Sequence, residues 1–364
     1  MRKRVLDFLC CPDCRREKLD LTVYAGKQNG KQEILEGEVR CLGCGSRFPV
    51  INGVPRMLPV SLRQFLTLFH RDFFERHPDL IPRNGTNAPD HRVARTLEGY
   101  SYQHVKLDDR GREFARWRQN LYECIPPEWK GSDFFRGKIG VDIGCGEGRH
   151  LYWTQEFGAE MVGLDVSEGV EVANTNTAES PRCHVVQGDI YHLPFKPAVF
   201  DFAYSIGVLH HLPTPRDGFR QILPSVKEGG KVSIWVYGLR EMRLWYRLSH
   251  MTWLRGIAPR LPRWAQYMVS LGVAGSLEMG IWLPCRLLSL FPGGDSVVKR
   301  IPLGDACHRS FKAKIRSVFD RIQPPVSHYH TAEELEGWFK DAGLTNTSVL
   351  NRNGRGWIAS GVNV

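Results

Sequence analysis

The chain has 364 residues, more than one average domain, so we expect two or three folding units. Apolar residues make up 42% and charged residues 24%, which excludes a disordered or fibrous chain. Lys and Arg outnumber Asp and Glu by 49 to 39, a net charge of +10. This surplus suits a polyanionic partner or an anionic membrane surface, but enzymes with neither partner also carry it.

The N-terminus does not match a secretory signal, because Asp7 interrupts the apolar run of MRKRVLDFLCCPDC. The most apolar stretch, 269–285, is Gly-rich and is interrupted by Glu278. It falls short of the roughly 18 uncharged residues of a membrane-spanning helix. We therefore expect a cytoplasmic protein whose ten cysteines stay reduced.

Two Cys-x-x-Cys pairs lie in the first domain, residues 1–60: Cys11 with Cys14, and Cys41 with Cys44. The 26 residues between the pairs read as two strands, KLDLTVYAG and EILEGEVRC, around a polar turn. Four thiolates suit tetrahedral Zn²⁺, and a closed four-thiolate site is structural rather than catalytic. A redox dithiol fits less well, because two pairs supply four ligands. The Pro and Gly residues of FPVINGVPRMLP mark turns and a boundary after this zinc ribbon.

The segments LDFLCCPDCRREKLDL and CLGCGSRFPVINGVPRML, within residues 5–58, resemble a known family. They are similar to the small zinc-ribbon activator subunit that partners tRNA and translation-factor methyltransferases. The resemblance implies an activator module fused to its own partner.

Residues 61–136 are expected to form a helical linker and the first helices of the core. Apolar residues recur at helical spacing in SLRQFLTLFHRDFFERH and again in EFARWRQNLYECI. The intervening HPDLIPRNGTNAPDHR is expected to be a polar loop.

From residue 137 to 238 short apolar runs alternate with helix-length segments, which predicts βαβ units and a parallel sheet. VDIGCGEG is a strand that enters a glycine turn before a helix, and Asp165 ends the next strand, where it can bind ribose hydroxyls. The glycine pattern departs from the Gly-x-Gly-x-x-Gly fingerprint of dinucleotide enzymes. An acid within the loop would repel a pyrophosphate, so a nicotinamide enzyme is disfavoured. S-adenosylmethionine fits, since it has a ribose diol, an amino-acid end and no phosphate.

The later segments agree with this interpretation. QGDIYHLPF places Asp189 and Ile190 after the third strand, where they can bind and flank an adenine. FDFAYSIGVLHHL and LPSVKEGGKVSIWVYG then supply the fourth and fifth strands.

From Gly137 onwards the chain resembles the class I methyltransferases of the type-11 group, which includes the ubiquinone/menaquinone C-methyltransferases. The resemblance implies an α/β, seven-stranded Rossmann-like core that binds S-adenosylmethionine and transfers its methyl group. The cofactor contacts that it implies are Asp142, Gly144, Cys145, Gly146, Asp165, Val166, Asp189, Ile190 and Ser205, the last near the sulfonium.

A general base is needed only when the acceptor keeps its proton until transfer. The catalytic candidates are His210, His211, Tyr329 and His330. The alternative for His210 is a packing or capping role, and the alternative for the later pair is a loop before a helix capped by a Thr331–Glu334 box. Tyr204 and nearby aromatic residues can hold a sulfonium by cation–π contact.

The insert, residues 239–325, is basic and rich in Trp near its start. It carries Arg240, Arg243, Arg247, Arg255, Arg260 and Arg263, interleaved with Trp245, Trp253 and Trp264. This mixture is typical of a membrane-surface element or of a lid over an amphipathic, anionic substrate. It also suits single-stranded RNA, or a helical cap that buries its Trp residues.

The last segment, residues 326–364, is expected to supply a helix and the final two strands of the core. The sequence thus predicts methyl transfer from S-adenosylmethionine to a small-molecule or lipid-linked acceptor, at O or C. The alternatives are an RNA methyltransferase and a non-catalytic cofactor-binding or activator scaffold.

Overall fold

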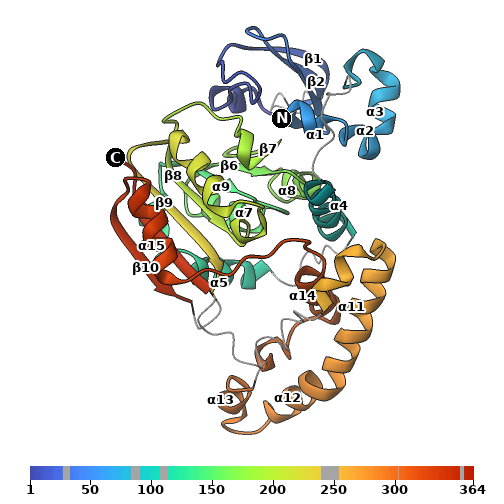
Figure 1. Cartoon of the computed structure of the whole chain (residues 1–364), viewed down its shortest axis with the longest axis vertical. Coiled ribbons are helices and arrows are strands. Elements are labelled where there is room, and N and C mark those ends of the chain that lie inside the picture. Colours follow the sequence, from blue (N-terminus) through green and yellow to red (C-terminus); the bar gives the residue numbers. More distant parts are fainter. Residues whose placement is uncertain (28–32, 83–90, 107–113, 239–253, 302, 353–355) are drawn as a thin grey trace.

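The computed structural model describes residues 1–27, 33–82, 91–106, 114–238, 254–301, 303–352 and 356–364. Its centre is an 11-stranded sheet in the order β1-β2-β3-β4-β7-β6-β5-β8-β9-β11-β10 (Figure 1). The strands are β1 (Leu19–Lys27), β2 (Glu33–Cys41), β3 (Arg47–Ile51), β4 (Val54–Met57), β5 (Ile139–Ile143), β6 (Glu160–Asp165), β7 (Cys183–Gly188), β8 (Phe200–Ile206), β9 (Val226–Tyr237), β10 (Thr345–Asn351) and β11 (Gly356–Val362).

The last seven strands, β5 to β11, form the predicted α/β core. Strands β5 to β9 are parallel, and β11 pairs antiparallel with both β9 and β10. Alternate side chains of β6 enter different apolar clusters, Met161 one and Val162 the other, as expected of a strand covered on both faces. The helices of this core are α7 (Arg149–Glu156), α8 (Gly169–Asn176), α9 (Pro215–Ile222) and α15 (Ala332–Asp341). The Thr331 hydroxyl accepts a hydrogen bond from the Glu334 backbone N–H, so the predicted cap of α15 is confirmed.

The N-terminal domain continues the same sheet. Strands β1 and β2 form the predicted antiparallel pair. The FPVINGVP segment forms the β3–β4 hairpin, with Asn52 and Gly53 both at positive φ in its turn. Strand β4 then pairs in parallel with β7. A single apolar cluster contains Phe8 and Phe48 of this domain together with Phe195 of the core, so the two share one hydrophobic interior.

Helices connect the N-terminal domain to the core. They are α1 (Val60–Arg63), α2 (Leu66–Phe69), α3 (Arg71–Arg76), α4 (His91–Lys106), α5 (Phe114–Cys124) and α6 (Ser132–Phe135). Helix α4 packs against α8 beside the sheet (Figure 1). Short 3-10 helices lie at Lys3–Asp7, Pro78–Leu80, Pro127–Trp129, Ile190–His192, Leu209–His211, Leu223–Ser225, Leu254–Gly256, Ala258–Arg260 and Gly304–Ala306.

The insert forms an arm at the end of the molecule opposite the N-terminal domain (Figure 1). It contains α11 (Arg263–Leu277), a π-helical turn (Glu278–Trp282), α12 (Leu283–Leu288), α13 (Gly294–Val298) and α14 (Phe311–Ile322). Residues 239–253, which hold three of the six arginines and two of the three tryptophans noted above, lie outside the described residues.

One helix of the arm corrects an expectation from the sequence. Residues Arg263–Leu288 form a continuous helix of 26 residues that, among the described residues, is the one long and apolar enough to cross a bilayer. The helix continues through Glu278 by way of the π-helical turn, and the Glu278 carboxylate pairs with Arg286 at 2.7 Å and with Lys314 at 2.6 Å. Only 22% of its most apolar window is buried.

Candidate functional site

The glycine turn after β5 is fastened to the neighbouring strand β6. The backbone N–H groups of Gly144 and Cys145 donate to the Leu164 carbonyl at 2.7 and 2.9 Å. Gly144 has a φ of +82°, and a side chain there would collide with Val208. Because only glycine fits, the turn presents its backbone at the carboxyl edge of the sheet, where a ligand can approach closely.

Asp165 joins this turn to the loop after β6. Its Oδ2 accepts from the Gly146 N–H and its Oδ1 from the Ser167 N–H, both at 2.8 Å. A carboxylate oxygen has further acceptor capacity, so these contacts leave room for ribose hydroxyls. The position therefore fits the predicted ribose contact.

Asp142 lies beneath the turn and is 1% exposed. The Tyr204 hydroxyl hydrogen-bonds to this carboxyl, but its Oδ2 atom is buried and has no hydrogen-bond partner among the described residues. Burial raises its pKa to about 8. A buried, unsatisfied carboxyl oxygen is costly unless a ligand completes it, and a cationic ammonium is the group that would do so. The cradle therefore fits S-adenosylmethionine, whose amino-acid end carries that group.

The other predicted cofactor residues have varied surroundings. The carboxylate of Asp189 accepts from His192 Nδ1 at 2.8 Å, and Ile190 beside it is buried. The buried Ser205 hydroxyl donates to the Ile143 carbonyl at 2.9 Å. Val166 packs against the apolar cluster of α1–α3, and Cys145 is buried.

Tyr204 is a core residue, which corrects the expectation of a sulfonium contact. It is 0% exposed and its ring lies 6.3 Å from that of Phe202. Its hydroxyl lies 3.3 Å from Thr154 Oγ1, on the side of the sheet covered by α7. The strand alternation that brings Ser205 to one face turns Tyr204 to the other.

Helices α4 and α14 cover the glycine turn. A Cβ atom on Gly146 would come within 2.8 Å of the His104 ring of α4. Arg316 of α14 forms an ion pair with the buried Glu147 carboxylate at 2.7 Å. Burial opposes ionisation of Glu147, but the charge of Arg316 prevails and the pKa falls to about 2. These contacts were not predicted, because no local motif marks a helix as the roof of a distant turn.

Three of the four predicted catalytic residues surround Tyr237, at the end of β9. The His210 ring stacks on that of Tyr237 at 3.8 Å between centroids, and those of His211 and Tyr329 lie at 5.6 and 5.7 Å. The Tyr100 ring of α4 lies 5.8 Å from that of His211. Tyr237 was not predicted; its place at the end of the fifth strand is the signal that would have found it.

The Nδ1 atom of His211 lies 3.0 Å from the Val326 carbonyl oxygen and 3.1 Å from the Ser327 hydroxyl. A carbonyl can only accept, whereas a hydroxyl can donate or accept, so both contacts are satisfied when Nδ1 carries the hydrogen. In that tautomer Nε2 carries the lone pair. Nε2 is therefore the atom of His211 that can take a proton.

The His330 side chain points away from this group. Its Nδ1 donates to Glu334 at 2.9 Å, and its ring lies 4.8 Å from that of Trp338. With His328 it lines an open hollow of about 580 Å³ between α9 and α15. Burial lowers its pKa. Its backbone N–H, by contrast, donates to the Tyr237 carbonyl at 2.9 Å, so it positions that strand end.

The four predicted metal ligands meet in the N-terminal domain. The sulfurs of Cys11, Cys14, Cys41 and Cys44 all lie within 4.8 Å of one another, with Cys11–Cys44 at 3.6 Å and Cys14–Cys41 at 3.5 Å. Four Zn–S bonds of about 2.3 Å in a tetrahedron separate the sulfurs by about 3.8 Å, so the cluster fits Zn²⁺. Cys10 instead donates to the Phe195 carbonyl at 3.0 Å.

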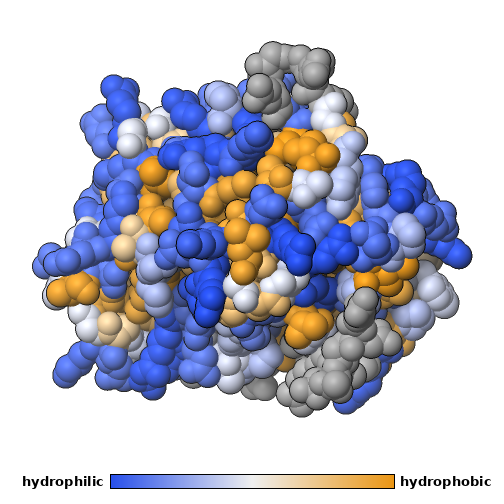
Figure 2. Space-filling view, turned by 90° about the horizontal axis from the view of Figure 1, so that it is seen from above, coloured by the Kyte–Doolittle hydropathy of each residue, from blue (hydrophilic) through white to orange (hydrophobic). Residues whose placement is uncertain are grey.

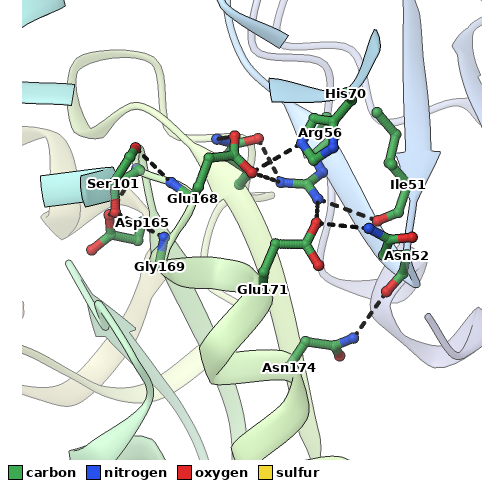
Figure 3. A network of polar contacts seen from close by, with 12 residues as sticks. Ile51, Asn52, Arg56, His70, Ser101, Asp165, Glu168, Gly169, Glu171 and Asn174 are labelled. Carbon is green, nitrogen blue, oxygen red and sulfur yellow. Dashed lines mark hydrogen bonds and ion pairs between the residues drawn. The ribbon is translucent and has the colours of Figure 1, made fainter. Parts of the chain in front are cut away.

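A buried charge network connects the N-terminal domain to the loop that follows Asp165 (Figure 3). Arg56 of β4 is 0% exposed and pairs with Glu168 at 3.2 Å and with Glu171. His70 Nε2 donates to Glu168 at 2.9 Å. The Glu168 backbone N–H donates in turn to the Ser101 hydroxyl of α4 at 3.0 Å. Burial opposes ionisation of Glu168, but the charge of Arg56 prevails and the pKa falls to about 2.

This network also explains a second set of metal-ligand groups. His70, Glu168 and Glu171 bring their ligand atoms within 4.8 Å of one another. The Arg56 guanidinium already supplies the positive charge that these carboxylates require. The group is therefore an ion-pair network between β4 and the cofactor loop.

Two segments of the chain match known families. Residues 141–234 match the methyltransferase domain family, and residues 2–53 match the Trm112p-like protein family. Together with the sheet and the four-cysteine cluster, these matches define a class I S-adenosylmethionine-dependent methyltransferase domain joined in one chain to a Trm112p-like domain.

Curated relatives fall into two groups. The chain is 33% identical over 109 residues to the tRNA (carboxymethyluridine(34)-5-O)-methyltransferase of Saccharomyces cerevisiae, covering 29% of this chain and 37% of that protein. It is 27% identical over 202 residues to the tRNA U34 carboxymethyltransferase of Vibrio campbellii, covering 48% and 62%. It is 32% identical over 99 residues to the sterol 4-C-methyltransferase strm-1 of Caenorhabditis elegans, covering 26% and 30%. The chain thus spans less than two thirds of each relative's length.

Proposed function

We propose that the protein transfers the methyl group of S-adenosylmethionine to an acceptor held beside the imidazole–aromatic group around Tyr237. One observation carries the proposal. The buried Asp142 Oδ2 atom, which has no hydrogen-bond partner among the described residues, lies beneath the glycine turn, where a side chain on Gly144 would collide with Val208. Val208, which packs on Gly144, directly precedes the helix of His210 and His211. Cofactor cradle and acceptor group are therefore neighbours.

S-adenosylmethionine, when bound, supplies an activated methyl group for an in-line displacement. The residues of this chain align the acceptor and exclude water, and alignment alone lowers such barriers by about 7–11 kcal/mol. His211 holds its Nδ1 hydrogen on the Val326 carbonyl and takes the acceptor's proton at Nε2. Zn²⁺ at the four cysteines stabilises the N-terminal domain and takes no part in the transfer.

The acceptor we favour is a small molecule or a lipid-like molecule methylated at O or C. Aromatic rings and imidazoles around Tyr237 offer flat, weakly polar surfaces to such a molecule. The similarity to a sterol methyltransferase and the apolar helix Arg263–Leu288 beside α14 support the same class of acceptor.

A second candidate is the methylation of tRNA. It is supported by the similarity to two tRNA-modifying enzymes, by the Trm112p-like domain and by the net charge of +10. An RNA acceptor predicts binding that weakens steeply as salt rises.

Methyl-labelled S-adenosylmethionine tests the proposal directly. The whole protein is incubated with lipid, small-molecule and RNA fractions of a cell extract, and label is followed into each. Label in the first two supports the favoured acceptor, whereas label in RNA alone selects the second candidate. Cofactor binding without label in any fraction would leave a scaffold role and overturn the proposal. His211→Gln is expected to lower kcat about 100-fold for a protonated acceptor with unchanged cofactor affinity.

A further inference from the structure

The long helix of the arm, Arg263–Leu288, and the turn after it carry an exposed apolar stripe. The stripe consists of the exposed apolar residues Trp264, Met268, Met279, Leu287 and Phe291, with the half-buried Leu283 and the small exposed residues Gly272 and Ser276 between them, at steps of four, four, four, three, four, four and four residues. Steps of three or four residues place successive members on adjoining turns of one side of the helix, and a run of steps of four turns this side slowly around the helix axis. Trp264 and Met279 are each 69% exposed, and Phe291 is 67% exposed.

The opposite face of the same helix is already used. Ala274, Trp282 and Cys285 join an apolar cluster with Ile315 and Val318 of α14. A helix packed on one side normally turns charged residues to the other. Here the solvent side is apolar instead, so a second covering surface is required.

The charges around the stripe indicate what covers it. None of the eight stripe residues is charged. Two of the three charged residues within Arg263–Leu288, Glu278 and Arg286, pair with each other. At the tip, where Leu290 is 77% exposed, the cations Lys299 and Arg300 are both exposed and outnumber the one exposed acid of α13, Asp295. An apolar stripe that ends beside exposed cations complements an anionic lipid surface.

We propose that the arm docks on the surface of an anionic phospholipid bilayer through this stripe, with Leu290 and Phe291 inserted and Lys299 and Arg300 at the lipid headgroups. Because α14 holds the other face, the helix lies against the bilayer rather than across it. Trp264 lies at the other end of the stripe, and Trp is a residue type that suits the interface between lipid and water. The inference rests in part on the proposed function, since α14 also contacts the glycine turn through Arg316 and so joins the docked arm to the proposed cofactor site.

Vesicle co-sedimentation of the whole protein tests the docking. Vesicles of phosphatidylcholine alone are compared with vesicles that also contain phosphatidylglycerol, without cofactor or acceptor. The protein is expected to bind the anionic vesicles more tightly. Leu290→Asp combined with Phe291→Asp should lower the bound-to-free ratio at least about tenfold. Lys299→Gln combined with Arg300→Gln should lower it several-fold on the anionic vesicles only.

Leu68→Asp is the matched control, since Leu68 of α2 is 67% exposed in the N-terminal half of the chain; its vesicle binding should equal that of the unmodified protein. The inference is overturned if the protein sediments with neither vesicle. It is also overturned if light scattering shows a dimer that Leu290→Asp with Phe291→Asp converts to a monomer, because a second copy then covers the stripe. Methyl transfer without vesicle binding would refute the docking alone, and vesicle binding without transfer to any fraction would refute the proposed function alone.

Discussion

Two arginines from distant parts of the chain reach the cofactor loops from different sides. Arg56 of the N-terminal domain pairs with Glu168 after β6, and Arg316 of the insert pairs with Glu147 in the glycine turn. The Arg56 side chain is 0% exposed and also donates to Gln187 and the Ile51 carbonyl, whereas that of Arg316 is 15% exposed. The first contact is a pair in which both side chains are 5% exposed or less, and the second is a pair in which the arginine is 15% exposed.

The difference reflects how the two regions join the core. The N-terminal domain extends the central sheet and shares its main apolar cluster. The insert has an apolar cluster of its own and leaves one face of its long helix exposed. The upper surface of the molecule is mainly hydrophilic, with apolar patches interrupted by polar residues (Figure 2). The N-terminal domain thus braces the loop after β6 from within the shared sheet, whereas the insert leaves one face of its long helix exposed.

Loss of the four-cysteine metal site should have the largest effect, because it should destabilise both the N-terminal domain and the core. Cys41→Ser is expected to abolish stoichiometric zinc and to destabilise the core as well as the N-terminal domain, because their interior is shared. Metal analysis and thermal unfolding measure the two effects. Cys10→Ser is the control, since its sulfur lies outside the cluster and zinc should remain. Unchanged metal content in Cys41→Ser would refute the ribbon.

Arg56→Met should have the next largest effect. It leaves Glu168 buried without its cation, which costs about 3–5 kcal/mol of unfolding free energy in comparable pairs. Denaturant unfolding measures it. Arg71→Met serves as the control, because Arg71 and its partner Glu75 are 86% and 64% exposed and the loss of this pair should matter far less. Equal losses in both variants would contradict a special role for the buried network.

Acid should destabilise the fold through the two carboxylates that pair with Arg56 and Arg316. Glu168 and Glu147 have pKa values of about 2 in the folded protein against 4.5 normally. A depressed pKa stabilises the fold above pH 4.5, and this stabilisation is lost as the pH falls from 4.5 towards 2. Unfolding free energy measured over that range should fall less in Arg56→Met than in the unmodified protein. An identical pH dependence would show that Arg56 does not set the pKa of Glu168.

Asp165→Ala tests the loop that both regions brace. It removes the acceptor for the Gly146 and Ser167 N–H groups and for the ribose, so cofactor affinity should fall about 100-fold by calorimetry. Asp217→Ala, an exposed change on α9, provides a control with unchanged affinity. Near-normal cofactor affinity in Asp165→Ala would refute the assignment of Asp165 to the ribose.

Arg316→Met should show the smallest effect. The Arg316 side chain is 15% exposed, so water can partly replace it at the buried Glu147 carboxylate, and the expected destabilisation is about 1–3 kcal/mol, below that of Arg56→Met. Unfolding of the two variants side by side gives the comparison. A larger loss in Arg316→Met would mean that the insert braces the cofactor site more strongly than the N-terminal domain does.

Local patterns in the sequence were sufficient for several parts of this protein. The spacing of Cys11, Cys14, Cys41 and Cys44 and the strand alternation around them predicted the ribbon, because ligand spacing and strand period act over few residues. The glycine turn and Asp165 followed from a strand–turn–helix pattern of the same kind.

Only the tertiary structure decided which distant groups meet. The sequence alone does not indicate that β4 pairs with β7 and buries Arg56, or that α4 covers Gly146. Nor does it indicate that the rings of His210 and His211 pack against Tyr237. The same holds for Glu278 of the long helix, whose charge is neutralised by Arg286 and by Lys314 of α14. These outcomes depend on burial and on pairing between segments far apart in the chain, and such long-range contacts leave no periodic signal in the sequence.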